Sequence, residues 1–139
     1  MDRIKEVRRI ALNDMETVFL ISEKGAVSFS LIPKEEDRLE LFFEKAGPDP
    51  LVQISVTGDA SCPGFAAGET RHNSAFTSSM KFLSQDVKES GEEKIIETTV
   101  TSPEGIKAVH TVVSKGTDRS IRIYTKVIND SPEEVTIEA

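Results

Sequence analysis

The chain contains few side chains that could act as nucleophiles or metal ligands. Cys62 is its only cysteine, and His72 and His110 are its only histidines. These three positions share no spacing typical of zinc ligands, and a structural zinc site needs four converging donors. A catalytic thiol also needs a neighbouring base, and His72 is the only histidine near Cys62 in the sequence. We therefore expect no metal site and a structural role for Cys62.

His110 lies in a segment where polar and apolar residues alternate. It shares its side of the predicted strand with Ile106, Ala108 and Val112. That position favours a partly buried, hydrogen-bonded histidine over a catalytic one.

The glycines do not form a cofactor-binding motif. Gly64 and Gly68 are not followed by Lys-Ser or Lys-Thr, as a phosphate-binding loop requires, and no Gly-x-Ser-x-Gly elbow occurs. We expect no cofactor and no catalytic residue within this chain.

Carboxylates are abundant, and a pair of carboxylates is the minimum machinery for hydrolysing a glycosidic bond. Most of them stand in charged runs such as 35–37 and 92–93, which is typical of solvated surface. Asp59 differs, because it follows Gly58 at the start of a long aperiodic loop and directly after a predicted strand. Its carboxylate could accept hydrogen bonds from the vicinal hydroxyls of a sugar. It could equally well accept them from backbone N–H groups and so cap its own loop.

The elements that position these residues are strands. Apolar residues alternate with period two through most of the chain, and turn residues separate the alternating segments. The long loop covers residues 58–74, a length that is usually functional or disordered. We predict an all-β fold, an antiparallel β-sandwich, with strands over residues 17–21, 26–32, 51–57, 75–85, 94–101, 106–114, 120–128 and 135–138.

Two of these strands alternate most clearly, and we expect their apolar residues to face one common core. The turn at 23–25 should form a hairpin in which Gly25 supplies a positive φ. Residues 39–43 fit a short strand and a helical turn equally well. The six predicted core residues are Val52, Ile54, Val56, Ile121, Ile123 and Val127.

Composition excludes several classes of protein. The chain has 139 residues, 24 acidic and 17 basic side chains and a net charge of -7, with no cationic stripe. Nucleic acids and anionic membranes both need clustered positive charge, so we expect neither as a partner. No apolar run reaches the roughly 18 residues of a membrane span, and residues 1–17 lack a secretion signal. One cysteine permits a reducing compartment, so we expect a cytoplasmic protein with a single domain over 1–139, or an incomplete piece of a larger domain.

Residues 50–74 resemble the amino-terminal domain of family 36 glycoside hydrolases, the α-galactosidases or melibiases. The similarity continues through residues 83–85, 95–99, 109–111 and 127–138. The family's residues recur here as Gly58, Asp59, Gly64, Phe65, Ala66, Gly68, Thr70, Asn73 and Ser74. The loop departs from the family pattern at Ser61, Cys62, Pro63, Glu69 and His72.

The resemblance implies a β-supersandwich domain that precedes a (β/α)8 catalytic barrel, where the two catalytic aspartates lie. The barrel's Lys-Trp-Asp motif is not in this sequence, which has no Trp. In tetrameric members the loop equivalent to 58–74 reaches towards the catalytic cleft of a neighbouring subunit. The resemblance therefore implies a non-catalytic domain, ending inside the supersandwich, whose Asp59, Phe65 and Asn73 contact a galactoside.

Two other functions remain open at this point, a stand-alone carbohydrate-binding module and a protein-interaction β-sandwich. A sandwich with unpaired strand edges and exposed apolar faces also tends to associate. We therefore expect a homo-oligomer at high concentration.

Overall fold

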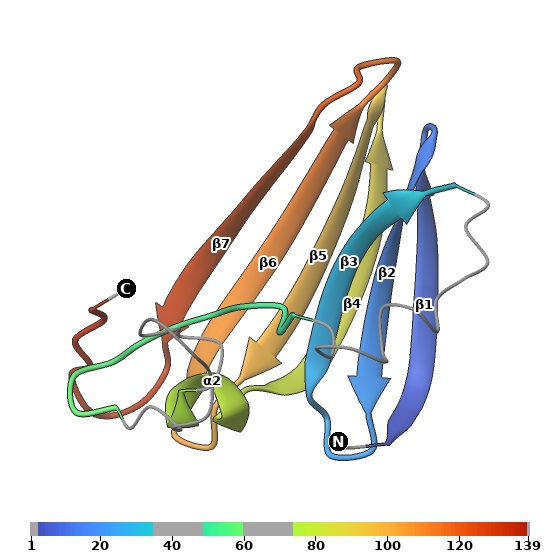
Figure 1. Ribbon diagram of the computed structural model, residues 1–139. Helices are drawn as coiled ribbons and strands as arrows, with labels where there is room; N and C mark the ends of the chain where they lie inside the picture. The colour runs from blue at the N-terminus through green and yellow to red at the C-terminus, as the bar shows by residue number, and fades with distance from the viewer. Residues whose placement is uncertain (1–2, 35–48, 60–73, 139) are drawn as a thin grey trace, which may run out of the picture.

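The structure, a computed structural model, describes residues 3–34, 49–59 and 74–138 (Figure 1). Two antiparallel sheets form a sandwich, one with strand order β1-β2-β3 and the other with order β4-β5-β6-β7. The predicted all-β sandwich is thus confirmed. The strands are β1 (Ile4–Leu12), β2 (Met15–Ser22), β3 (Val27–Pro33), β4 (Lys81–Ser90), β5 (Glu93–Thr101), β6 (Ile106–Lys115) and β7 (Ile121–Asn129), and a short helix α2 (Ala75–Ser79) precedes β4.

The hairpin between β2 and β3 forms as predicted. Gly25 adopts φ +85°, and its N–H donates to the carbonyl oxygen of Ser22 at 2.9 Å. A Cβ at Gly25 would come within 3.3 Å of the Lys81 side chain. Glycine therefore meets both the conformational and the spatial demand of this turn.

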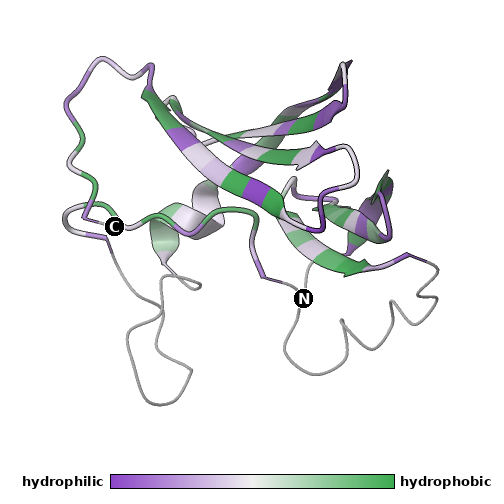
Figure 2. Ribbon diagram, turned by 90° about the horizontal axis from the view of Figure 1, so that it is seen from above, coloured by the Kyte–Doolittle hydropathy of each residue, from purple (hydrophilic) through white to green (hydrophobic). Residues whose placement is uncertain are grey.

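The strand pattern arises because alternate residues of each strand face the space between the sheets. Figure 2 shows hydrophobic and hydrophilic residues alternating along the strands of the larger sheet. Phe19 of β2 and Ile96 of β5 are fully buried in this shared core, and Val18, Leu20 and Ile32 form a second cluster. The buried residues of the main core are Leu12, Phe19, Ile21, Val27, Leu51, Val52, Ile54, Met80, Ile96, Val100, Ala108 and Val112.

Two of the six predicted core residues are wrong. Val52 and Ile54 are buried, and Val56 and Ile121 pack against the core. Ile123 is 45% exposed and Val127 36% exposed, because both lie on β7, the edge strand of the larger sheet. Ile121 is the only residue of β7 that packs against the main core, so the rest of the apolar face of β7 lies outside this core.

A network of polar side chains also joins the sheets. The guanidinium group of Arg8 on β1 donates to Oε1 of Gln85 on β4 at 3.3 Å and lies 5.0 Å from the ring centre of Phe82. Gln85 in turn donates to the hydroxyl of Thr98 at 2.8 Å. These contacts fix the relative position of β1 and β4 at the side of the sandwich away from β7.

Three predicted elements differ in the structure. Residues 75–79, predicted as the start of a strand, are the helix α2, and β4 begins only at Lys81. Residues 51–57 form no strand, and residues 135–138 contribute only the isolated bridge between Ile137 and Val56. The strand β1 was not predicted, because its apolar residues Ile4, Val7, Ile10, Ala11 and Leu12 do not alternate with period two. Residues 39–43 lie outside the described residues.

No helix in the described part of the chain has the length and apolar character required to cross a membrane.

Candidate functional site

The candidate site is built around Asp59, which directly follows the turn at 57–58. Gly58 adopts φ +79°, and the N–H of Asp59 donates to the carbonyl oxygen of Val56 at 3.0 Å. This turn directs the Asp59 side chain towards α2, where its Oδ1 accepts the N–H of Phe76 at 3.0 Å. The carboxylate therefore links the start of the loop to the first turn of the helix.

The two oxygens of Asp59 differ in their surroundings. Oδ1 has the Phe76 N–H, whereas Oδ2 is buried and has no hydrogen-bond partner in the residues that the structure describes. A buried carboxylate oxygen without a donor costs free energy, because it has lost its water and gained nothing in exchange. Asp59 thus has one oxygen occupied in holding the fold and one buried oxygen that lacks a donor in the described residues.

The helix α2 is fixed by side chains at its amino-terminal end. The first N–H groups of a helix have no partner within the helix. Ser74 is the N-cap, and its Oγ accepts the N–H of Thr77 at 3.0 Å, while Asp59 satisfies the N–H of Phe76. The two caps therefore come from Asp59 and Ser74, the first and last residues of the segment 59–74.

A buried pair of hydroxyls takes the place of a neighbouring strand at Ile54, in the middle of the segment 51–57. Oγ1 of Thr77 accepts the N–H of Ile54 and donates to the carbonyl oxygen of the same residue, both at 3.1 Å. Ser74 Oγ also lies 3.1 Å from that carbonyl oxygen. The segment needs no β-ladder here, since these side chains satisfy the backbone of Ile54.

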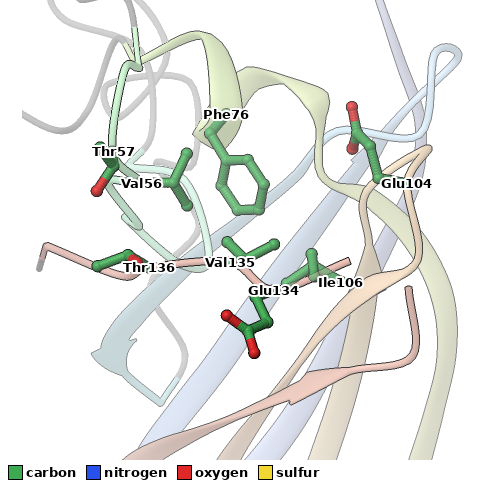
Figure 3. Close-up of a pocket in the computed structure, with 8 residues that line it drawn as sticks. All are labelled: Val56, Thr57, Phe76, Glu104, Ile106, Glu134, Val135 and Thr136. Atoms are coloured by element: carbon green, nitrogen blue, oxygen red, sulfur yellow. The ribbon is translucent and has the colours of Figure 1, made fainter. Parts of the chain in front are cut away.

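A cavity of about 360 Å³ lies beside this corner (Figure 3). Phe76 connects the two, because its N–H binds Asp59 and its ring lines the cavity. The walls come from the segment 51–57, from α2, from the turn before β6 and from the segment after β7. The lining residues are Val56, Thr57, Phe76, Glu104, Ile106, Glu134, Val135 and Thr136.

The cavity combines an apolar wall with two carboxylates. Val56, Phe76 and Val135 lie close together, whereas Glu104 and Glu134 point away from one another (Figure 3). An acid and a nucleophile that cleave one glycosidic bond must flank a common point. Glu104 and Glu134 do not have this arrangement, so the geometry suits binding and not hydrolysis by this pair.

His110 is the second group that the sequence singled out. It is 4% exposed, and its ring lies 5.0 Å from the ring of Phe29 in the core. Burial lowers the pKa of His110 from 6.5 to about 4, so the ring is neutral at neutral pH. The predicted burial is confirmed, but Nδ1 has no hydrogen-bond partner among the described residues. His110 is thus a neutral core residue, away from the Asp59 corner.

The structure places one of the three predicted sugar-contacting residues. Asp59 lies at the corner described above, whereas Phe65 and Asn73, like Cys62 and His72, lie outside the described residues. Sequence reasoning missed Phe76 and Thr77 because their segment was assigned to a strand. The signal that could have found them is Ser74, a preferred N-cap residue, three positions before Thr77. The described residues contain no group of three or more His, Cys, Asp or Glu side chains able to hold a metal ion.

Comparisons with protein-family models, with curated proteins and with solved structures gave no significant match to this chain.

Proposed function

We propose that the chain is the non-catalytic amino-terminal β-sandwich domain of an α-galactosidase-like glycoside hydrolase in the cytoplasm. In this function it packs against a (β/α)8 catalytic domain and contributes to the rim of a galactoside-binding cleft. The proposal is supported by the all-β sandwich, by the loop motif that begins at Gly58 and Asp59, and by the continued resemblance through residues 127–138.

The observation that carries the proposal is the unequal use of the two Asp59 oxygens. Oδ1 is held by the N–H of Phe76, and Oδ2 has no donor in the described residues. A sugar hydroxyl is a suitable donor for such an oxygen, and hydrogen bonds to a charged acceptor contribute about 1.5–3 kcal/mol. Oδ1 keeps the carboxylate in place, and Oδ2, which is buried in this chain, accepts a sugar hydroxyl when the residues that cover it move aside. This arrangement favours Asp59 as a contact at the rim of a sugar site.

The proposal assigns the chemistry to the neighbouring domain. Glycoside hydrolysis needs two carboxylates on opposite sides of the scissile bond. Asp59 has one oxygen committed to Phe76, and the two glutamates of the cavity point apart (Figure 3). The catalytic pair therefore comes from the barrel, and this domain supplies binding contacts and support.

The test compares the 139-residue chain with the natural polypeptide that carries it. We expect p-nitrophenyl α-galactoside to be hydrolysed by the natural polypeptide and not by the chain alone. Titration calorimetry of the chain alone with galactose, melibiose and raffinose should give no binding heat at millimolar sugar. A natural polypeptide without α-galactosidase activity would contradict the proposal, and saturable sugar binding by the chain alone would identify a stand-alone carbohydrate-binding module instead.

A further inference from the structure

Among the described strands, β7 is an edge of the larger sheet. It pairs with β6 over nine consecutive residue pairs, from Ile106 with Asn129 to Ser114 with Ile121, and no other described strand adjoins it (Figure 1). Every second residue of an edge strand directs its N–H and C=O groups outward, where they can pair with a further strand. The free edge of β7 is thus able to accept a strand over its whole length.

Three large apolar or aromatic side chains of β7 are exposed at this edge. Ile123 pairs with Val112 of β6 and Val127 with Ala108, so both share a face with fully buried residues of the core. They are nevertheless 45% and 36% exposed. On the opposite face, Tyr124 is 49% exposed.

The other edge of the same sheet is protected. The strand β4 has a register shift between Phe82 and Ser84, and its exposed stretch carries Asp86, Lys88 and Glu89. Irregular pairing and charged side chains are two devices that prevent strands from adding to an edge. The pairing of β7 with β6 has no register shift, so irregular pairing does not protect the edge at β7.

We propose that β7 binds β7 of a second copy of this chain, antiparallel, around a two-fold axis at Thr125. The two four-stranded sheets then continue into one sheet, and the apolar face of β7 remains on the same side in both copies. Thr125 is the middle residue of Ile121–Asn129, so this register alone pairs all nine residues of each strand.

The sequence of β7 is complementary to itself in this register. Ile123 lies opposite Val127 of the second copy, and by symmetry Val127 lies opposite Ile123, which covers both exposed residues of the apolar face. On the other face Lys126 lies opposite Tyr124, a pairing that permits a cation–π contact.

Both charged residues of β7, Arg122 and Lys126, are cationic, and this restricts the register further. Around Thr125 neither faces the other, because Arg122 lies opposite Ile128. A two-fold axis at Tyr124 would place Arg122 opposite Lys126, and like charges directly opposite destabilise a strand pair. Self-complementarity around Thr125 therefore favours a second copy as the partner of β7.

Sedimentation equilibrium of the 139-residue chain, up to about 1 mM, measures the association. We expect a monomer–dimer equilibrium that Val127→Lys weakens by at least about 10-fold, since it places a charge against an apolar residue twice in each dimer. The matched control is Val87→Lys on β4, because Val87 is also exposed, at 47%, on the opposite edge of the sheet. A strictly monomeric wild type would overturn the proposal and leave β7 to a strand from another polypeptide. A Val87→Lys effect as large as that of Val127→Lys would also overturn it.

Disulfide cross-linking tests the register without depending on Val127. In a Cys62→Ser background, Thr125→Cys gives each chain one thiol. At the two-fold axis this thiol lies opposite the same thiol of the second copy. We expect an air-oxidised dimer from this variant. The control Arg122→Cys is also exposed on β7, but the offset of six residues separates the two thiols by about 20 Å, too far for a disulfide. Cross-linking of Arg122→Cys but not of Thr125→Cys would contradict the proposed pairing.

Discussion

Asp59 and Phe76 are joined by one hydrogen bond, from the N–H of Phe76 to Oδ1 of Asp59 at 3.0 Å. This bond ties Asp59, which directly follows the turn at 57–58, to a helix that begins 16 positions later, at Ala75. The sequence left two roles open for Asp59, capping and sugar binding. The structure gives a capping role to Oδ1, for the helix and not for the loop itself, and leaves Oδ2 without a partner in the described residues.

The hydroxyl of Thr77 should be essential for the stability of this corner. Thr77→Val keeps the shape of the side chain but leaves the buried N–H of Ile54 without its acceptor. We expect a loss of about 1–3 kcal/mol in the free energy of unfolding, measured by urea denaturation. Ser78→Ala, an exposed position of the same helix, is the control and should change stability by less than about 0.5 kcal/mol. Equal effects of the two substitutions would remove Thr77 from its assigned role.

The exposed position of Ile123 predicts a small effect of its truncation on the monomer. At micromolar concentration, Ile123→Ala should lower the free energy of unfolding by less than about 1 kcal/mol, because the side chain is 45% exposed. Ile96→Ala, at a position with 0% exposure in the core, should cost about 3 kcal/mol. Similar losses for both variants would show that β7 is covered in the monomer.

Burial of His110 should make folding stability depend on pH. Burial lowers the pKa of His110 from 6.5 to about 4, so the unfolded chain binds a proton at this ring before the folded chain does. Stability therefore falls as the pH decreases from about 6.5 to about 4, by about 3 kcal/mol, and the His110 contribution is constant above this window.

The comparison with His110→Phe isolates this contribution, since a phenyl ring can pack against Phe29 in the same place. Urea denaturation of both proteins at several pH values gives the difference. We expect the wild type to lose stability relative to the variant on acidification. Parallel pH profiles of the two proteins would contradict a depressed pKa for His110.

The regular strands could be predicted from the sequence because alternation of apolar and polar residues reports burial of one face. The strands β5, β6 and β7 and the hairpin at Gly25 follow their predicted ranges within about two residues. The same alternation misled for Ile123 and Val127. It identifies the apolar face of a strand, but the extent of the opposite sheet decides how much of that face is covered.

The candidate site was less predictable, because its contacts join distant parts of the sequence. Asp59 could be identified because it follows Gly58 and because the alternation of apolar and polar residues ends after residue 57. Its bond to Phe76 depends on a helix of five residues, whose formation is determined by the hydroxyls of Ser74 and Thr77. A segment this short has no helical period to detect, so residues 75–79 were assigned to the following strand. The cavity beside Phe76 depends on the segment 134–136, which returns to Val56 only in the folded chain.

The most direct test of the proposed function is the specificity constant of Asp59→Asn in the natural polypeptide, measured with melibiose together with the melting temperature. The amide oxygen of Asn can still accept the N–H of Phe76, whereas its NH₂ group, a donor, takes the place of the acceptor Oδ2. We predict a decrease in kcat/KM of about 10-fold or more with a melting temperature near that of the wild type. Asp59→Ala, which removes both oxygens, should lower both quantities. Unchanged kcat/KM with a lower melting temperature for Asp59→Asn would restrict Asp59 to a structural role and contradict the proposed sugar contact.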